Sequence, residues 1–208
     1  MKKFIYALWA VLLVGTSSCT KYNLIDTGDV NGNHDTTLWG YLQTDSYNWD
    51  SLSLMIKHAE MVEVFEGKGE YGKDMTFFGF TNHSIRSYML ANGYKRVTDI
   101  PKEDCAYFLK ISIIPGRHKL ADIPNGRRST DPDQIIGTGG KEYKTMEGRK
   151  LWIFTFREPY GDIPNAGPYS IYVASSAAKK ITRIASTDIT TNTGIVHSLP
   201  YHYRINDL

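Results

Sequence analysis

The spacing of apolar and polar residues predicts two helices early in the chain, at residues 38–42 and 49–63. In both stretches apolar side chains recur about every 3.6 positions, which places them on one face of a helix. Asn48 and Asp50 lie at the break between the stretches and are candidate caps, because their side-chain oxygens accept hydrogen bonds from the free N–H groups of a first turn. Glycines within residues 67–72 then end the helical region.

A strand that leads directly into a third helix is predicted next. Residues 75–80 form an apolar run rich in phenylalanine, and both Thr81 and Asn82 after it are residues that cap helices. Asn92 and Gly93 supply the stop signal of this helix. The junction of strand and helix is therefore expected to be a central element of the fold.

The second half of the chain predicts loops and strands. A fourth helix begins at Pro101, and residues 117–150 after it are rich in glycine, proline and aspartate, which predicts turns and loops. Residues 151–156 are almost all apolar and predict a strand buried on both faces. Residues 169–173 and 180–184 alternate between apolar and polar, as half-buried strands do.

Residues 187–199 predict a hairpin in which the second strand carries His197. Asn192 and Gly194 form its turn, because both residue types tolerate a positive φ angle. Helices thus come first and strands later along the chain. This order predicts the α+β class, with N-terminal helices packed on a sheet or wedge of mostly C-terminal strands.

The N-terminus has the layout of a secretory signal. Lys2 and Lys3 are followed by an apolar run at residues 4–14, by small residues at 15–18, and then by Cys19. The apolar run is too short for the roughly 20 residues that cross a bilayer as a helix. A cysteine directly after small residues resembles the signal of bacterial lipoproteins, which implies that Cys19 carries lipid; the alternative is an ordinary extracytoplasmic cysteine.

The chain is accordingly expected to have three parts. Residues 1–18 are a signal peptide that is removed, residues 19–37 a flexible tether, and residues 38–208 a single domain. The expected location is the bacterial outer membrane, with the domain lipid-anchored and facing the periplasm or the surface. Residues 29–35 superficially resemble a calcium loop but lack its glycine and its bidentate glutamate, so a solvated tether is favoured and no metal or cofactor is predicted.

Charge and cysteine content exclude several classes of protein. The full chain has 24 Lys and Arg against 22 Asp and Glu, and the excess lies in the signal, so the mature protein is close to neutral. A neutral chain argues against nucleic acid as a partner. If Cys19 carries lipid, Cys105 has no partner within the chain, and the fold depends on its hydrophobic core.

Few residues carry candidate chemistry. The glycine cluster at 137–141 ends in a lysine but lacks the spacing of a phosphate loop, and a plain loop is favoured. Tyr143, Tyr160 and Tyr169 are candidate contact platforms, since tyrosine combines an apolar face with a polar tip; packing against the sheet is the alternative for each.

Two segments resemble signatures of the fasciclin domain family. Residues 76–85 match its first signature, residues 188–199 approximate its second, and the segment at 113–116 looks like its aliphatic-Pro-Gly motif. The matching positions are Thr76, Phe78, Thr81, Asn82, Pro115, Gly116, Asn192, Gly194 and His197. The resemblance covers residues 38–208 and implies a single fasciclin-like domain in which the hairpin lies beside residues 76–85.

The chain also departs from the family pattern. Thr193 is an extra residue within the second signature, and Ile111 and Ser112 replace a Tyr-His pair linked with adhesion in animal members. Asp188 and Ile189 match a dipeptide that the family ties to receptor binding. The alternative for this dipeptide is a strand-end aspartate and a core isoleucine.

The resemblance implies a non-catalytic binding or adhesion module of the cell envelope, which contacts a glycan, a matrix component or a partner protein. A second possibility is a structural accessory subunit of an outer-membrane uptake assembly. A hydrolase is the third, with a serine activated by His197 or His202 and oriented by Asp188. The sequence contains no Gly-x-Ser-x-Gly elbow that would support the third possibility.

Overall fold

The computed structural model describes residues 32–208, which form one compact unit. The expectations for the signal peptide, for Cys19 and for most of the tether, including Asp29 in the calcium-like segment, therefore lie outside the described residues. Within the described part of the chain, no helix has the length and apolar character needed to cross a membrane.

The beginning of the compact unit lies earlier than residue 38. Asn33 pairs with Thr190, whose carbonyl accepts a hydrogen bond from the backbone N–H of His34 at 2.8 Å. The carbonyl of Thr36 accepts another from the N–H of Asn192. The last part of the predicted tether thus lies against the C-terminal hairpin.

The helices come first, as the apolar spacing predicts. They are α2 (Leu38–Leu42), α3 (Ser46–His58), α4 (Val62–Phe65), α5 (Asn82–Asn92) and α6 (Lys102–Ile111), with 3-10 turns η1 (Val97–Asp99) and η2 (Leu120–Asp122).

The predicted caps of the second helix were wrong. The α3 helix begins at Ser46, and Asp45 caps it by accepting a hydrogen bond from the backbone N–H of Asn48. Asn48 therefore lies inside the first turn. The predicted single helix over residues 49–63 is also divided, because Glu60 adopts a positive φ of 55° between α3 and α4.

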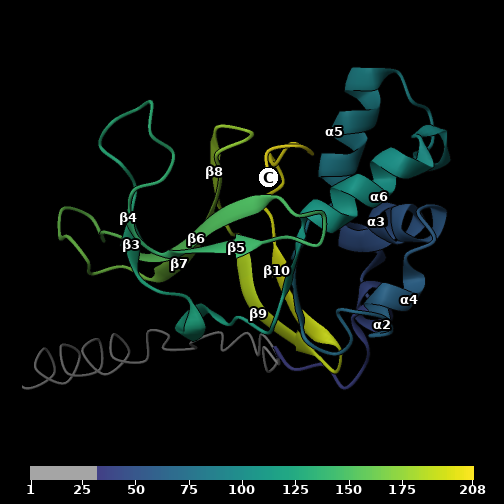
Figure 1. Cartoon of the computed structure of the whole chain (residues 1–208), viewed down its shortest axis with the longest axis horizontal. Helices are drawn as coiled ribbons and strands as arrows, with labels where there is room; N and C mark the ends of the chain where they lie inside the picture. Colours follow the sequence, from purple (N-terminus) through teal and green to yellow (C-terminus); the bar gives the residue numbers. More distant parts are fainter. Residues whose placement is uncertain (1–31) are drawn as a thin grey trace, which may run out of the picture. The chain divides into compact units, whose positions relative to one another are not determined.

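The first sheet lies beside the helices and has strand order β2-β1-β10-β9 (Figure 1). Its strands are β1 (Met75–Gly79), β2 (Ile113–Pro115), β9 (Ser186–Thr191) and β10 (Gly194–Ser198). The central pair β1 and β10 is parallel, and both outer pairings are antiparallel. Segments more than a hundred residues apart therefore meet at the centre of this sheet.

The second sheet is an antiparallel meander of four strands. These are β5 (Lys141–Lys144), β6 (Lys150–Arg157), β7 (Tyr169–Ser175) and β8 (Lys180–Arg183). A short ribbon of β3 (Gly126–Arg127) and β4 (Thr138–Gly139) accompanies it. The prediction that residues 117–150 are only turns and loops was wrong, because these short strands gain their stability from pairing with distant partners rather than from local propensity.

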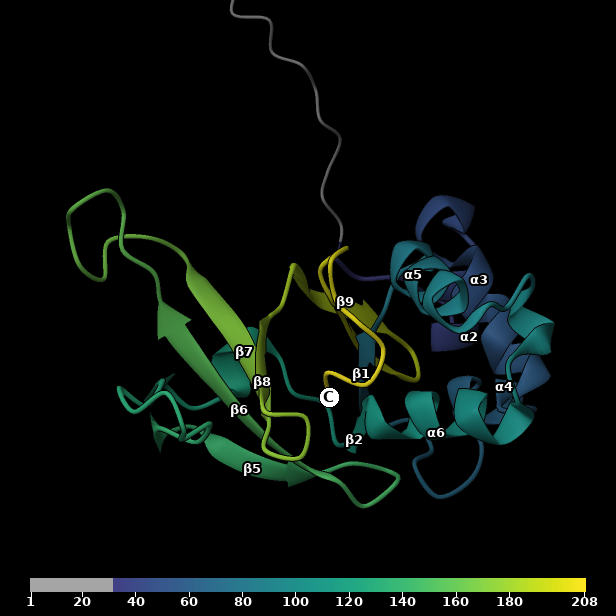
Figure 2. The same cartoon turned by 90° about the horizontal axis from the view of Figure 1, so that it is seen from above.

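The main core fills the space between the helices, the first sheet and the inner face of the second sheet (Figure 2). The β6 and β7 strands contribute Leu151, Ile153, Ile171 and Val173 to it. Their alternate residues face the opposite side and form a separate aromatic cluster of Trp152, Phe154, Tyr172 and Ala174. The prediction of a strand buried on both faces at residues 151–156 is thereby confirmed, and so is the α+β class.

The C-terminal hairpin forms as predicted but for a different reason at its turn. Neither Asn192 nor Gly194 has a positive φ angle. A Cβ atom at Gly194 would lie 2.7 Å from the Met75 carbonyl oxygen, so glycine is required by the close approach of β10 to β1. Thr193 is buried, and its hydroxyl accepts a hydrogen bond from Leu38 N–H and donates one to the Phe65 carbonyl. The extra residue joins the hairpin to two helices.

Candidate functional site

The two signature segments meet in the first sheet. Phe78 of β1 lies opposite His197 of β10, and their ring centroids are 5.8 Å apart. Ile189 of β9 lies opposite Val196, next to the same position. The prediction that the hairpin packs beside residues 76–85 is therefore confirmed.

Both nitrogens of His197 are occupied by backbone groups. Nδ1 accepts a hydrogen bond from the Asp188 N–H, so the proton lies on Nε2, which donates to the His118 carbonyl at 2.8 Å. Burial lowers the pKa of the imidazole, although the His118 carbonyl opposes this shift. His197 thus has no nitrogen left to activate a serine, and the arrangement required of a hydrolase is not assembled around it.

Asp188 and Ile189 take part in the packing of the domain itself. The Asp188 carboxylate accepts a hydrogen bond from Leu120 N–H at 2.8 Å and so holds η2 against β9. The Ile189 side chain packs against the main core. The role of this dipeptide in binding a receptor stays a prediction.

Other signature residues join the segments to one another. Thr76 donates from its hydroxyl to the Gly116 carbonyl and accepts from His118 N–H, which fixes the chain where it leaves β2 after Pro115. The Asn82 amide accepts from Ser51 N–H and donates to two carbonyls at the start of α3. Thr81 occupies the cap position of α5 without a side-chain hydrogen bond.

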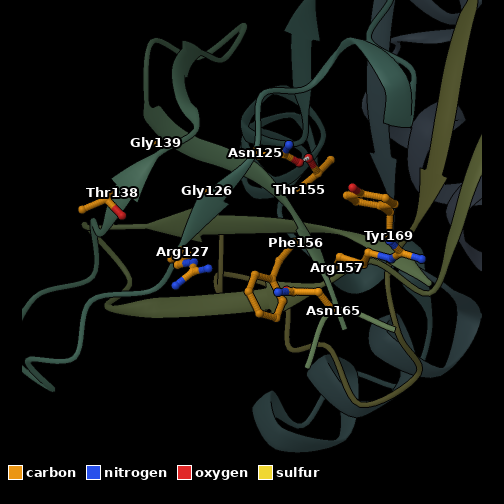
Figure 3. Close-up of a pocket in the computed structure, with 10 residues that line it drawn as sticks. All are labelled: Asn125, Gly126, Arg127, Thr138, Gly139, Thr155, Phe156, Arg157, Asn165 and Tyr169. Atoms are coloured by element: carbon orange, nitrogen blue, oxygen red, sulfur yellow. Dashed lines mark hydrogen bonds between the residues drawn. The ribbon is translucent and has the colours of Figure 1, made fainter. Parts of the chain in front are cut away.

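A polar pocket of about 390 Å³ lies at the edge of β6, beyond the end of β5, where the segment leading into β3 runs beside it (Figure 3). It is lined by Asn125, Gly126, Arg127, Thr138, Gly139, Thr155, Phe156, Arg157, Asn165 and Tyr169. We call it the arginine pocket. A second hollow of about 530 Å³ adjoins it on the aromatic face of the sheet, and the two share Arg127, Phe156 and Asn165.

Glycines allow the wall of the arginine pocket to form. A Cβ atom at Gly126 would lie 2.7 Å from Cβ of Phe154, and one at Gly140 would lie 2.6 Å from the Trp152 ring nitrogen. The Trp152 N–H donates to the Gly139 carbonyl at 2.9 Å. The β3–β4 ribbon thus packs closely against the aromatic cluster, which explains the glycines here. The plain loop predicted at residues 137–141 was wrong, because β4 and the first residue of β5 lie there.

The charged side chains that line the arginine pocket are cationic. Its lining contains two arginines and no Asp or Glu. Arg157 donates to the Gly167 carbonyl and lies over the Tyr169 ring, which leaves other N–H groups of its guanidinium available. The backbone of Arg127 pairs with Thr138 of β4, but its guanidinium has no hydrogen bond or ion pair within residues 32–208. A group that accepts several hydrogen bonds or carries negative charge would complement such a lining.

The carboxylate in the adjoining hollow already has partners within the domain. This carboxylate belongs to Glu158, which accepts a hydrogen bond from the Tyr172 hydroxyl at 2.5 Å and lies 3.6 Å from Arg183. Burial, together with the Glu158 hydrogen bond, raises the pKa of Tyr172. Arg128 lies over the ring of Tyr172 at 4.5 Å. The Glu158 charge is therefore compensated locally and does not neutralise Arg127.

The three tyrosines predicted as contact platforms have different surroundings. Tyr143 is buried and packs against His118, so its prediction as a platform was wrong. Tyr160 is 74% exposed, and Tyr169 is 49% exposed and lines the arginine pocket. Among the described residues no group of three or more His, Cys, Asp or Glu side chains could hold a metal ion.

Sequence patterns did not identify the arginine pocket. The sequence pattern predicted only a loop at Arg127 and Arg128. It showed no motif that includes Asn125 or Asn165. The available signal was the run of aromatic residues at alternate positions 152, 154 and 156, which gives β6 a second apolar face that something must cover.

No family model and no curated protein matches the chain. Among solved structures, it is similar to a FAS1 domain pair from the insect cell adhesion molecule fasciclin I, with a TM-score of 0.54 and 16% sequence identity. The match covers 79% of this chain and 49% of the domain pair, so the chain spans about half the length of that protein. At this identity the likeness concerns the fold. The described part of the chain therefore has the fasciclin-like α+β fold that its two signature segments predict.

Proposed function

We propose that this chain is a non-catalytic binding module, anchored to a bacterial outer membrane through lipid on Cys19, and that it contacts an acidic glycan through the arginine pocket. The fold supports a binding role in general, since the FAS1 pair of similar structure comes from a cell adhesion molecule. The single observation that carries the ligand class is the lining of the pocket, which holds Arg127 and Arg157 but no carboxylate.

The chemistry of the lining suits an acidic sugar. A guanidinium binds a carboxylate with two parallel hydrogen bonds, and amide and hydroxyl groups such as those of Asn125 and Thr138 bind sugar hydroxyls. Arg157 lies over the Tyr169 ring, and the exposed part of this ring offers an apolar surface on which a sugar ring would pack. A glycan with uronic acid groups satisfies all three requirements.

Binding of oligogalacturonate by the mature chain, measured by calorimetry, tests the proposal. We expect binding that weakens as salt rises, because exposed charges are screened. The Arg127→Ala variant should lose about tenfold in affinity, which corresponds to about 1.4 kcal/mol. Arg204→Ala removes an exposed arginine outside the pocket and should bind like the wild type. Equal binding of a neutral dextran oligomer, or of the Arg127→Ala variant, would contradict the proposal.

The anchor is tested separately. Intact mass spectrometry of the protein extracted from membranes should find cleavage before Cys19 and a mass increase equal to its acyl chains. A Cys19→Ala variant should leave the membrane fraction. An unmodified Cys19 would remove the anchor from the proposal and leave the glycan site unaffected.

A structural accessory subunit of an outer-membrane uptake assembly is the second candidate. The observation that favours it is a groove lined by exposed apolar side chains on the helices, at residues distinct from those of the arginine pocket.

A further inference from the structure

The helices α3 and α5 pack against each other (Figure 2). A groove of about 1100 Å³ is lined by residues of both helices. It shares no lining residue with the arginine pocket. Small-molecule pockets usually have volumes of about 300–1,000 Å³, so this groove is large for such a ligand. Its size and its position between two helices suit a segment of another chain.

Each helix presents a regular stripe to the groove. Tyr47, Ser51 and Leu54 recur at helical spacing on α3, and His83, Arg86 and Leu90 do so on α5. Tyr47 is 79% and Leu90 is 72% exposed, although both are large apolar side chains. These stripes are separate from the buried positions by which α3 and α5 join the core. The apolar residues are therefore not explained by the packing of the domain.

The groove is firmly built at its base. Asn82 at the start of α5 accepts a hydrogen bond from Ser51 N–H and donates to the carbonyls of Ser46 and Tyr47 on α3. At the other end Val97, the first residue of η1, is buried, and η1 packs against α3. A partner would accordingly meet a surface that is already formed, which lowers the entropic cost of binding.

The charge on the rim of the groove has one sign. Arg86 and Lys95 line it and form no side-chain hydrogen bond or ion pair within the described residues. Arg96 also lines it and pairs with Asp99, and the lining contains no Asp or Glu. A concave apolar surface flanked by unpaired cations is complementary to an apolar stripe flanked by carboxylates.

We propose that the groove between α3 and α5 is a docking site for an acidic amphipathic helix of a partner protein. Apolar residues of that helix at positions i, i+3 or i+4, and i+7 would cover Leu54 and Leu90, and its flanking carboxylates would meet Arg86 and Lys95. A bilayer surface cannot follow a concave groove between two helices. A second copy docked by the same groove would bring the Arg86 side chains of both copies together, and such like charges repel.

A displayed library of helical 14-residue peptides, selected against the mature chain, tests this proposal. We expect enriched peptides with an apolar helical stripe flanked by Asp and Glu. Leu90→Ser and Arg86→Glu should each weaken the binding of the best peptide at least tenfold. Raised salt should weaken peptide binding to the wild type, and it should weaken binding to Arg86→Glu by a smaller factor. Arg204→Glu, the matched reversal of an exposed arginine outside the groove, should bind within twofold of the wild type.

Three results would overturn the proposal. The enriched peptides could lack acidic residues, they could bind Arg86→Glu and Leu90→Ser as strongly as the wild type, or the selection could yield no peptide that binds the groove. Leu90 and Arg86 are exposed, so thermal unfolding should be unchanged in both variants, and circular dichroism checks this. If the wild type binds vesicles with anionic lipid and both variants do not, the groove is assigned to a membrane instead. If the wild type self-associates in light scattering and both variants do not, the groove is assigned to a second copy.

Discussion

Phe78 and His197 face each other across the parallel strands β1 and β10, with ring centroids 5.8 Å apart, although 118 positions of sequence separate them. This contact joins the two segments that resemble fasciclin signatures. It also explains why His197 is a structural residue, since its ring is buried between strands and both of its nitrogens are bonded to backbone.

The stability of the domain is expected to fall in mild acid because of His197. Burial lowers the pKa of its imidazole in the folded state, whereas the unfolded chain takes up the proton near the ordinary value of about 6.5. Below that pH the unfolded state binds more protons, so the free energy of unfolding decreases as pH falls. Urea unfolding at a series of pH values between 7.5 and 5 measures this slope.

A His197→Gln variant isolates this contribution. It removes the titrating group, so the pH slope below 6.5 should be shallower than in the wild type, even though the variant is less stable overall. His202 is exposed, and His202→Gln should keep the wild-type slope. A slope that is unchanged in His197→Gln would show that another group is responsible.

Thr193→Val is expected to destabilise the domain by about 1–3 kcal/mol. The valine keeps the shape of the side chain but leaves the buried Leu38 N–H and the Phe65 carbonyl without their partner, and an unsatisfied buried polar group costs about this much. Chemical denaturation measures the change. Thr130→Val, at an exposed position, should shift the free energy of unfolding by less than about 0.5 kcal/mol. Equal stability of the two variants would contradict the assigned role.

Asn82→Asp is expected to destabilise the domain by about 0.5–1.5 kcal/mol, because the two hydrogen bonds that it loses are exposed to solvent. The carboxylate still accepts from Ser51 N–H, but it cannot donate to the Ser46 and Tyr47 carbonyls and repels them instead. Asn92→Asp is the matched control, because the Asn92 amide donates to one carbonyl only and lies in an exposed position. Thermal unfolding of the two variants should separate them, and a larger loss in Asn92→Asp would refute the role of Asn82.

The Cys105 thiol is expected to be unreactive in the folded protein. The side chain is completely buried, and burial raises its pKa to about 11, so almost no thiolate exists at pH 8. Iodoacetamide at pH 8 should alkylate Cys105 only in denaturant, as peptide mass spectrometry would detect. Rapid labelling without denaturant would mean that α6 opens locally in the native state.

Much of the fold follows from local patterns. The helical spacing of Leu52, Met55 and Ile56 identifies a buried face of α3, and the junction at Thr81 marks the start of α5. Residues 151–156 predict a strand buried on both faces because nearly every side chain is apolar. Where local patterns failed, as at residues 126–139, the short strands depend on backbone pairing that leaves no period in the sequence.

The surfaces proposed to bind ligands were not predictable in the same way. Arg127 becomes a pocket residue because the β3–β4 ribbon lies on the aromatic cluster of the second sheet. Leu90 and Tyr47 line one groove because α5 packs along α3. Both sites are assembled from segments that are distant in sequence, and no spacing rule connects them.

The sequence by itself determined the class of the fold, the order of its helices and strands, and the two segments that resemble fasciclin signatures, because these depend on residue periodicity and on local turn chemistry. Tertiary structure decided what those segments do. The parallel pairing of β1 with β10 buries His197 and gives Thr193 two distant partners, and a contact of this kind depends on the packing of the whole domain. The packing of the domain likewise leaves the side chains of Arg127 and Arg86 without an ion pair among the described residues.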